Sequence, residues 1–351
     1  MSNNIGYLYN KGSFKELREI KSSKDYILKK HIEDINKEIL GVKITKWDYL
    51  RFDDDKEKDK AEEEAEDKEK GITRFQRVTV YPGLLIGSGY NHDVNFDELG
   101  KSFDGSKEAS FKIGFSFDHI SGMPFIPGSS IKGMLRSFFP NEYKKDRGIE
   151  NFTEDQECKK EYISDLLNAV REPNEEEKEF TKEDIDEIEE VIFSGVNKDG
   201  SRVEPYKRDI FFDAIPVSIE NNQESEPNKR TKTLFGSDYI TPHVDKNGDP
   251  APLKNPVPIK FLKVNPNVVY QFSFRFSNSI LSNGVKLSKD KKTKLFKKIL
   301  SQSGLGAKTS VGYGQFDYTI KEKEEKKIEQ QKMCKTLQKN IRKGLQLFIG
   351  G

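Results

Sequence analysis

Hydrophobic positions along the chain follow two different periods. Short alternating or continuous apolar runs predict strands over 77–86, 110–118, 209–217, 268–276 and 315–320. Apolar residues three and four apart predict helices over 14–40, 129–139 and 288–303, two surface helices within 156–195 that are broken at Pro173, and a basic amphipathic helix over 321–351. The mixture of helices and strands predicts an α+β protein.

The helix predicted over 288–303 has the clearest ends. Ser288 belongs to the residue types that cap helix N-termini, and Gly304 suits the position that follows a helix C-terminus. The helix also has one apolar face, which carries Leu295, Phe296, Ile299 and Leu300.

Composition excludes several classes of protein. Of the 351 residues, 34% are hydrophobic and 34% are charged, and no window holds the roughly 18 consecutive apolar residues of a membrane span. The first residues lack the apolar region of a secretory signal. Cys158 and Cys334 stand far apart in hydrophilic surroundings, which argues against a disulfide framework and a cysteine zinc site. We therefore expect a cytoplasmic protein with no metal and no cofactor.

Charge is unevenly distributed, although the formal net charge is only +1. The run 53–70 holds 11 acidic and 5 basic residues, which predicts a flexible loop because like charges repel. Basic stretches occur at 286–298 and 321–343. Such stretches are typical both of surfaces that follow phosphate backbones and of ordinary solvated helix faces.

The segment GMPFIPGSSIKGMLR predicts a tight turn that leads into a helix. Its glycine is Gly128, and Ser129 or Ser130 is the predicted N-cap. A helix start with free amides, hydroxyl groups and the nearby cations Lys132 and Arg136 is suited to binding a phosphate, although an ordinary capped helix has the same pattern.

The segment GLGAKTSVGYGQF is a second candidate phosphate site, because glycines let a backbone approach a sugar-phosphate chain closely. It is not a Walker motif, since Ala307 separates Gly306 from Lys308 and the predicted order is helix, loop, strand. The residues that we expect to contact a ligand here are Gly304, Gly306, Lys308, Thr309, Ser310 and Gly312.

A third set of polar residues lies on aromatic-rich strands and consists of Asp213, Asp238, Tyr239 and His243. Histidine and aspartate together are compatible with acid and base catalysis. The chain has only four histidines, however, and none has the spacing of a metal-binding motif. The pattern therefore favours a structural role.

Together these segments resemble the RAMP superfamily of CRISPR RNA-binding proteins. IPGSSIKGMLR and GLGAKTSVGYG carry the resemblance, and FFDAIPV, SDYITPH, NPVPIKFLKV and YQFSFRF look like the subunit-six family of the type III-B effector, the Cmr complex. The resemblance covers most of 81–316 and implies a ferredoxin-like, RRM-related core with insertions. We therefore expect an N-terminal helix and acidic loop over 1–75, a core over 76–320 with a helical insertion at about 141–205, and a C-terminal basic helix over 321–351.

The resemblance also implies a function. Members of this family are non-catalytic RNA-binding subunits that cap the backbone filament of the effector and bind guide RNA toward its 3′ end in antiviral defence. The implied partners are guide CRISPR RNA, target RNA and the other Cmr subunits, namely the backbone, small and 3′-end capping subunits. We expect both glycine segments to face one RNA groove, and Gly306→Val to impair RNA binding more than folding.

Two other functions are compatible with the sequence. The first is a RAMP endoribonuclease that processes precursor RNA with His243 or His119 as general acid or base. The second is a scaffold that contacts only protein. The insertion over 156–195 is expected to pack on this protein or on a neighbouring subunit.

Overall fold

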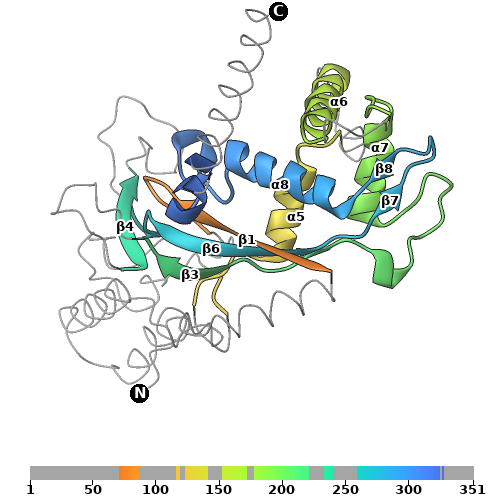
Figure 1. Cartoon of the computed structure of the whole chain (residues 1–351). Coiled ribbons are helices and arrows are strands. Elements are labelled where there is room, and N and C mark those ends of the chain that lie inside the picture. The colour runs from red at the N-terminus through yellow and green to blue at the C-terminus, as the bar shows by residue number, and fades with distance from the viewer. Residues whose placement is uncertain are drawn as a thin grey trace, which may run out of the picture.

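The computed structural model describes residues 71–86, 116–118, 123–140, 152–171, 178–220, 233–240, 259–324 and 326–327 (Figure 1). Several predicted features lie outside these residues: the helix over 14–40, the acidic run 53–70, most of the strand over 110–118 and most of the C-terminal helix. No helix within the described ranges is long and apolar enough to cross a membrane.

An antiparallel sheet forms the centre of the fold. Its strands run in the order β2-β6-β1-β9, and β3 also pairs with β6. The bounds are Ile72–Thr79 for β1, Ile210–Phe211 for β2, Ile215–Ile219 for β3, Val268–Arg275 for β6 and Phe316–Asp317 for β9. In the register of β1 and β6, Phe75 lies opposite Phe272 and Arg77 lies opposite Tyr270.

One face of the sheet is covered by two helices, α5 (Gly128–Arg136) and α8 (Lys289–Ser303), as Figure 1 shows. Alternate residues of β6 supply large aromatic side chains to this face, which is why the face must be buried. Phe274 and Phe296 of α8 both pack around Phe211 of β2, with ring centroids 5.6 and 5.8 Å from it. These rings form the middle of the hydrophobic core.

The predicted ends of α8 are confirmed. The Ser288 hydroxyl accepts a hydrogen bond from the Lys291 amide at 3.2 Å, and Gly304 is the C-cap with φ 70°. The apolar face predicted for this helix is fully buried.

The insertion packs on the protein itself. It consists of α6 (Phe152–Ala169), α7 (Asp184–Glu189), a π-helical turn over Glu190–Ser194 and a 3-10 turn over Pro205–Lys207. Its apolar residues belong to the same core as α8, and they include Ile163, Leu167, Ile185 and Ile188. Figure 1 shows α6 and α7 beside α8. Of the two expected alternatives, packing on this protein or on a neighbouring subunit, the structure shows the first.

Two hairpins extend from the sheet. The first joins β4 (Phe235–Ile240) to β5 (Ile259–Val264), and the second joins β7 (Ser279–Ile280) to β8 (Lys286–Leu287). α7 contacts the turn between β7 and β8. Asp184 of α7 accepts a hydrogen bond from Asn283 in this turn at 2.7 Å. A last short 3-10 helix spans Thr309–Val311 between α8 and β9.

Three strands differ from the sequence prediction. The strand predicted over 77–86 is β1, which begins earlier, at Ile72, and ends earlier, at Thr79, because Val80 and Gly83 form a turn. The strand predicted over 209–217 is interrupted between β2 and β3. The strand predicted over 315–320 stops at Asp317, and a helix begins at Ile320.

Candidate functional site

A cleft of about 450 Å³ lies between α5 and the loop that follows α8. Leu84, Ile86 and Ile126 line it from the segments next to the sheet. Ser130 and Met134 line it from α5, and Ser137 and Phe138 line it from the turn that follows this helix. The loop after α8 contributes residues 303–307 and Thr309. The two glycine segments that the sequence singled out therefore line one cleft.

The turn into α5 requires a glycine. A Cβ at Gly128 would lie 2.2 Å from the Phe211 carbonyl oxygen, so no other residue fits without movement of the backbone. The Gly128 amide donates a hydrogen bond to Asp213 Oδ1 at 2.7 Å. Asp213 is thus placed by the break between β2 and β3, and its carboxylate satisfies the first amide of the helix.

The predicted serine N-cap is wrong. Pro127 occupies the N-cap position, and the helix has no side-chain cap at that position. Ser129 and Ser130 lie inside the first turn and are exposed. Asp213 takes over the capping role from a distant part of the chain, which no local pattern could have shown. The Ser130 hydroxyl remains at the edge of the cleft.

Lys132 and Arg136 do not line the cleft. Arg136 Nε lies 2.8 Å from Glu189 Oε1, so this guanidinium joins α5 to α7. The Lys132 ammonium lies 6.0 Å from the Phe211 ring centroid, and burial, followed by the charge of Arg136, lowers the pKa of Lys132. The structure therefore separates Lys132 from Ser130, which lines the cleft, because positions two residues apart on a helix face different directions. Ser129, Lys132 and Arg136 share another face of α5 by their spacing of three and four residues.

The glycine loop after α8 is fixed by backbone contacts. The Ala307 amide donates to the Leu85 carbonyl at 3.0 Å, and the Gly314 amide donates to the Gly83 carbonyl at 2.8 Å. At Gly306, φ is 101° and a Cβ would lie 2.3 Å from the Leu85 carbonyl oxygen. This contact predicts a substantial loss of folding stability for Gly306→Val, which argues against the expectation that this change would impair RNA binding more than folding.

The same constraint applies at the start of the loop. At Gly304, φ is 70° and a Cβ would lie 2.6 Å from Gln315 Nε2. Gly304 therefore has a structural reason to be glycine, and it also lines the cleft.

The other predicted ligand contacts in this loop are Lys308, Thr309, Ser310 and Gly312. Lys308 is half-buried and has φ 59°, in the left-handed region, and its carbonyl accepts from the Val311 and Tyr313 amides. Thr309 lines the cleft, whereas Ser310 is exposed. Gly312, with φ 93°, turns the chain next to Pro82.

Asp238 forms contacts that hold neighbouring parts of the fold together. Its Oδ2 lies 2.7 Å from Lys263 Nζ and accepts a hydrogen bond from the Tyr313 hydroxyl at 2.7 Å. Burial of the phenol, together with this hydrogen bond, raises the pKa of Tyr313 above its usual range. The contact ties the β4–β5 hairpin to the end of the glycine loop. Tyr239, next to it in the chain, is 53% exposed.

The remaining catalytic candidates do not form a site in the described part of the chain. His119 and His243 lie outside the described residues. Within the described ranges, no group of three or more His, Cys, Asp or Glu side chains could hold a metal ion.

Sequence reasoning missed most of the cleft lining. Met134 and the C-cap residue Ser137 follow the predicted residue Ser130 at helical spacing, and that pattern could have been found. The contributions of Leu84, Ile86 and Ile126 depend on how distant segments pack, so no local signal indicates them.

Comparison with known proteins places these observations in a family. The sequence profile of the RAMP superfamily matches residues 78–317. The chain is 26% identical over 209 residues to the CRISPR system CMR subunit Cmr6 of Saccharolobus solfataricus, with 59% of this chain and 49% of that protein covered. It is 29% identical over 223 residues to the CRISPR system Cmr subunit Cmr6 of Pyrococcus furiosus, with 55% and 57% covered. The alignments thus span about half the length of these relatives.

Among solved structures, a chain of the type III-B Cmr-beta complex bound to cognate target RNA is similar. The TM-score is 0.42 and the identity is 20%, with 90% of this chain and 86% of that chain covered.

Proposed function

Because this chain belongs to the RAMP superfamily, we propose that it is a non-catalytic RNA-binding subunit of a type III-B CRISPR effector. In this proposal it caps the backbone filament and binds guide RNA toward its 3′ end. Its partners are guide RNA, target RNA and the other Cmr subunits. The similarity to two proteins named Cmr6 supports the assignment to this complex.

The strand order supports a ferredoxin-like core. β1 and β2 both pair antiparallel with β6, so they are parallel to each other with β6 between them, and α5 connects them. In the same way β6 and β9 flank β1, and α8 connects them. Two strand–helix–strand units that interlock in this way are what the proposed βαββαβ plan predicts.

The observation that carries the proposal is the cleft between α5 and the glycine loop. Its rim offers the hydroxyl groups of Ser130, Ser137 and Thr309, and its floor is apolar. Hydroxyl groups suit phosphate and ribose oxygens, and an apolar floor accepts sugars or base faces of any sequence. A subunit that must accept any guide needs this kind of contact, because backbone contacts carry no sequence information.

The contacts of the two candidate carboxylates support the absence of catalysis. Asp213 holds the start of α5, and Asp238 holds the β4–β5 hairpin through Lys263 and Tyr313. A general base must lie within hydrogen-bond reach of the reacting hydroxyl, and neither carboxylate lines the cleft.

Ser130→Asp tests the cleft as the RNA site. Ser130 lines the cleft in the first turn of α5, which contains no acidic residue. An aspartate there stabilises the helix by about 0.3–1 kcal/mol through the helix dipole, but it repels phosphate. We expect RNA affinity to fall about tenfold, which is ~1.4 kcal/mol, while the melting temperature stays the same or rises. RNA affinity is measured by filter binding and stability by thermal unfolding.

Ser129→Asp is the matched control. Ser129 is exposed in the same turn but does not line the cleft, so the control adds the same charge and the same helix stabilisation. We expect a clearly smaller loss of RNA affinity. Equal affinity of Ser130→Asp and wild type would refute the cleft as the binding site.

A further inference from the structure

A cluster of cations lies outside the cleft, where α8, β1 and the start of the C-terminal helix meet. Arg77 of β1 is its centre and is 1% exposed. The guanidinium carbon lies 5.1 Å from the Phe75 ring centroid and 4.4 Å from that of Tyr318. Two aromatic rings therefore hold the guanidinium in place.

The hydrogen bonds of Arg77 use only part of its donors. Nη1 donates to the Gln76 carbonyl at 2.7 Å and to the two carboxylate oxygens of Glu322 at 3.0 and 3.2 Å. Nε is buried and has no hydrogen-bond partner in the described part of the chain. Because this donor is buried, an ion from solvent does not reach it, and Arg77 acts as a fixed positive charge at the base of the cluster.

Two lysines lie close to this guanidinium. The Lys297 ammonium, from α8, lies 4.8 Å from the same Phe75 ring centroid. The Lys326 ammonium lies 3.2 Å from the same Tyr318 ring centroid. Neither lysine forms an ion pair with another described residue. Burial, followed by the charge of Arg77, lowers the pKa of Lys297.

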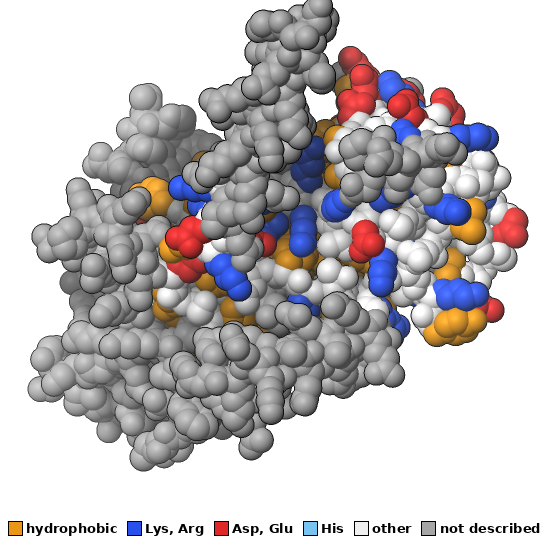
Figure 2. All heavy atoms as spheres, viewed as in Figure 1, with side chains coloured by type: hydrophobic (Ala, Val, Ile, Leu, Met, Phe, Trp, Pro, Cys, Tyr) orange, Lys and Arg blue, Asp and Glu red, His pale blue; other side chains and the backbone are white. Residues whose placement is uncertain are grey.

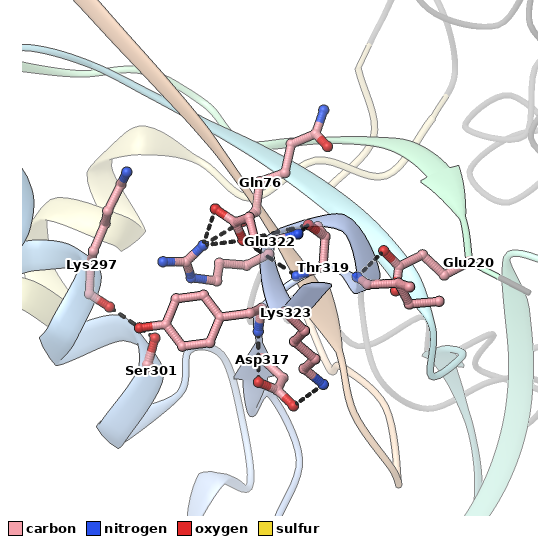
Figure 3. A network of polar contacts seen from close by, with 11 residues as sticks. Gln76, Glu220, Lys297, Ser301, Asp317, Thr319, Glu322 and Lys323 are labelled. Carbon is pink, nitrogen blue, oxygen red and sulfur yellow. Dashed lines mark hydrogen bonds and ion pairs between the residues drawn. The ribbon is translucent and has the colours of Figure 1, made fainter. Parts of the chain in front are cut away.

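Negative charge does not balance this cluster among the described residues. Figure 3 shows Glu220, Asp317 and Glu322 as carboxylates near the cluster, and no dashed line reaches the ammonium of Lys297. Glu322 pairs with Arg77, and Asp317 pairs with Lys323 at 2.6 Å. Lys297 and Lys326 therefore form no ion pair with another described residue, although the charge of Glu322 also attracts Lys297.

The cluster opens to solvent on the α8 side of the molecule. Glu322 is 30% exposed, Lys326 is exposed and Lys297 is half-buried. Further Lys and Arg side chains are visible on the face of the molecule around α8 (Figure 2). Lys297 precedes the cleft residue Ser303 by six positions on one helix, a distance of about 9 Å along the axis.

We propose that Lys297 and Lys326, which lie beside the buried Arg77, bind a backbone phosphate of the RNA strand where it leaves the cleft along α8. The inference rests on the proposed function, because it takes RNA as the ligand. The phosphate compensates the positive charge of the two lysines, which are the accessible cations of the cluster. The Arg77–Glu322 pair fixes the guanidinium, and the lysines provide the net charge.

The test compares Lys297→Met with Lys298→Met in the full chain. Methionine keeps the apolar stem against Phe75 and removes the charge. We expect Lys297→Met to weaken RNA binding and to reduce the slope of log affinity against log salt by about one unit. Lys326→Met should do the same. Lys298 is also half-buried on α8 but contacts neither ring, so its variant should change the slope less.

The outcomes separate this inference from the proposed function. If the wild-type chain binds no RNA, the proposed function fails and this inference fails with it. If wild type binds RNA and Ser130→Asp weakens binding, but Lys297→Met and Lys326→Met behave like Lys298→Met, only this inference is overturned.

Amine labelling gives a second readout on the wild-type chain. Bound RNA should protect Lys297 from acetylation more strongly than it protects Lys298, and inorganic phosphate should protect it weakly. Protection of Lys297 by the neighbouring subunits without RNA would overturn the inference and identify the cluster as a protein contact.

Discussion

Gly306 shows how a residue that looks functional in the sequence also has a structural requirement. Its composition and spacing indicated a loop that approaches a phosphate chain. In the structure its Cα approaches the Leu85 carbonyl of its own chain, and φ is positive. Sequence alone identifies the need for a close approach but not the group that is approached.

Gly306→Val is therefore expected to lower the free energy of unfolding by about 2–4 kcal/mol, because both the steric contact and the positive φ oppose a branched side chain. Gly133→Ala is the control. Gly133 lies inside α5, and a Cβ there would meet nothing within 4 Å, so alanine should stabilise the protein by about 0.5–1 kcal/mol. Urea unfolding measures both. A Gly306→Val chain as stable as wild type would show that the loop can move away from Leu85.

Lys132 and Arg136 illustrate a different limit of the sequence at the residue scale. Both are basic and follow the glycine turn, so they were grouped with Ser130. The helix places Ser130 and Met134 toward the cleft, whereas Arg136 turns toward Glu189. Helical spacing separates these two faces, but only the packing of α5 against the rest of the protein determines which face lines the cleft.

At the scale of elements, α8 was predictable and the first strand was not. Ser288, Gly304 and the apolar face of α8 are local signals, and the structure confirms each of them. The run RVTVYPGLLI looks like one strand because both of its halves are apolar. Its second half is apolar because Leu84 and Leu85 are buried. Leu84 forms an isolated bridge with Val264 of the β4–β5 hairpin, and this long-range contact has no local signal in the sequence.

A buried ion pair fixes α8 to the strand edge. Lys292 Nζ lies 2.6 Å from Asp209 Oδ2, and the two side chains are 1% and 2% exposed. Burial raises the pKa of Asp209 and lowers that of Lys292, even though the charge of each group stabilises the charged form of the other. The pair therefore depends on both partners being present.

Lys292→Met should cost about 3–5 kcal/mol of unfolding free energy, since it leaves the Asp209 carboxylate buried without its cation. The double variant Asp209→Asn with Lys292→Met should recover much of that loss, because it removes both charges. Denaturant unfolding of the two single variants and the double variant measures the coupling. Additive losses in this cycle would contradict a direct interaction.

At the scale of the whole molecule, one hydrophobic core joins the sheet, α5, α8 and the insertion. Phe193, which follows α7, packs against Phe139 and Phe296 with ring centroids 5.1 and 6.0 Å apart. The insertion thus supports the two helices that cover the sheet. Since the cleft lies between α5 and the loop after α8, its shape depends on this shared core.

Hydrogen bonds attach the start of the C-terminal helix to the rest of the protein. Thr319 and Glu322 form a reciprocal capping box, with the Glu322 amide donating to Thr319 Oγ1 and the Thr319 amide donating to Glu322 Oε2, both at 3.3 Å. The Ile320 amide donates to Glu220 at 2.9 Å, as Figure 3 shows. The sequence predicted a basic helix here, but not its attachment to Arg77, which is remote in the chain.

Photocrosslinking of guide RNA in the reconstituted effector tests the central claim most directly. A guide that carries 4-thiouridine near its 3′ end is crosslinked, and the attached peptides of this chain are identified by mass spectrometry. We predict crosslinks within 128–138 of α5 and within 303–313 of the glycine loop, because these segments line the cleft. Efficient crosslinks to neighbouring subunits, with none to either segment of this chain, would contradict the account.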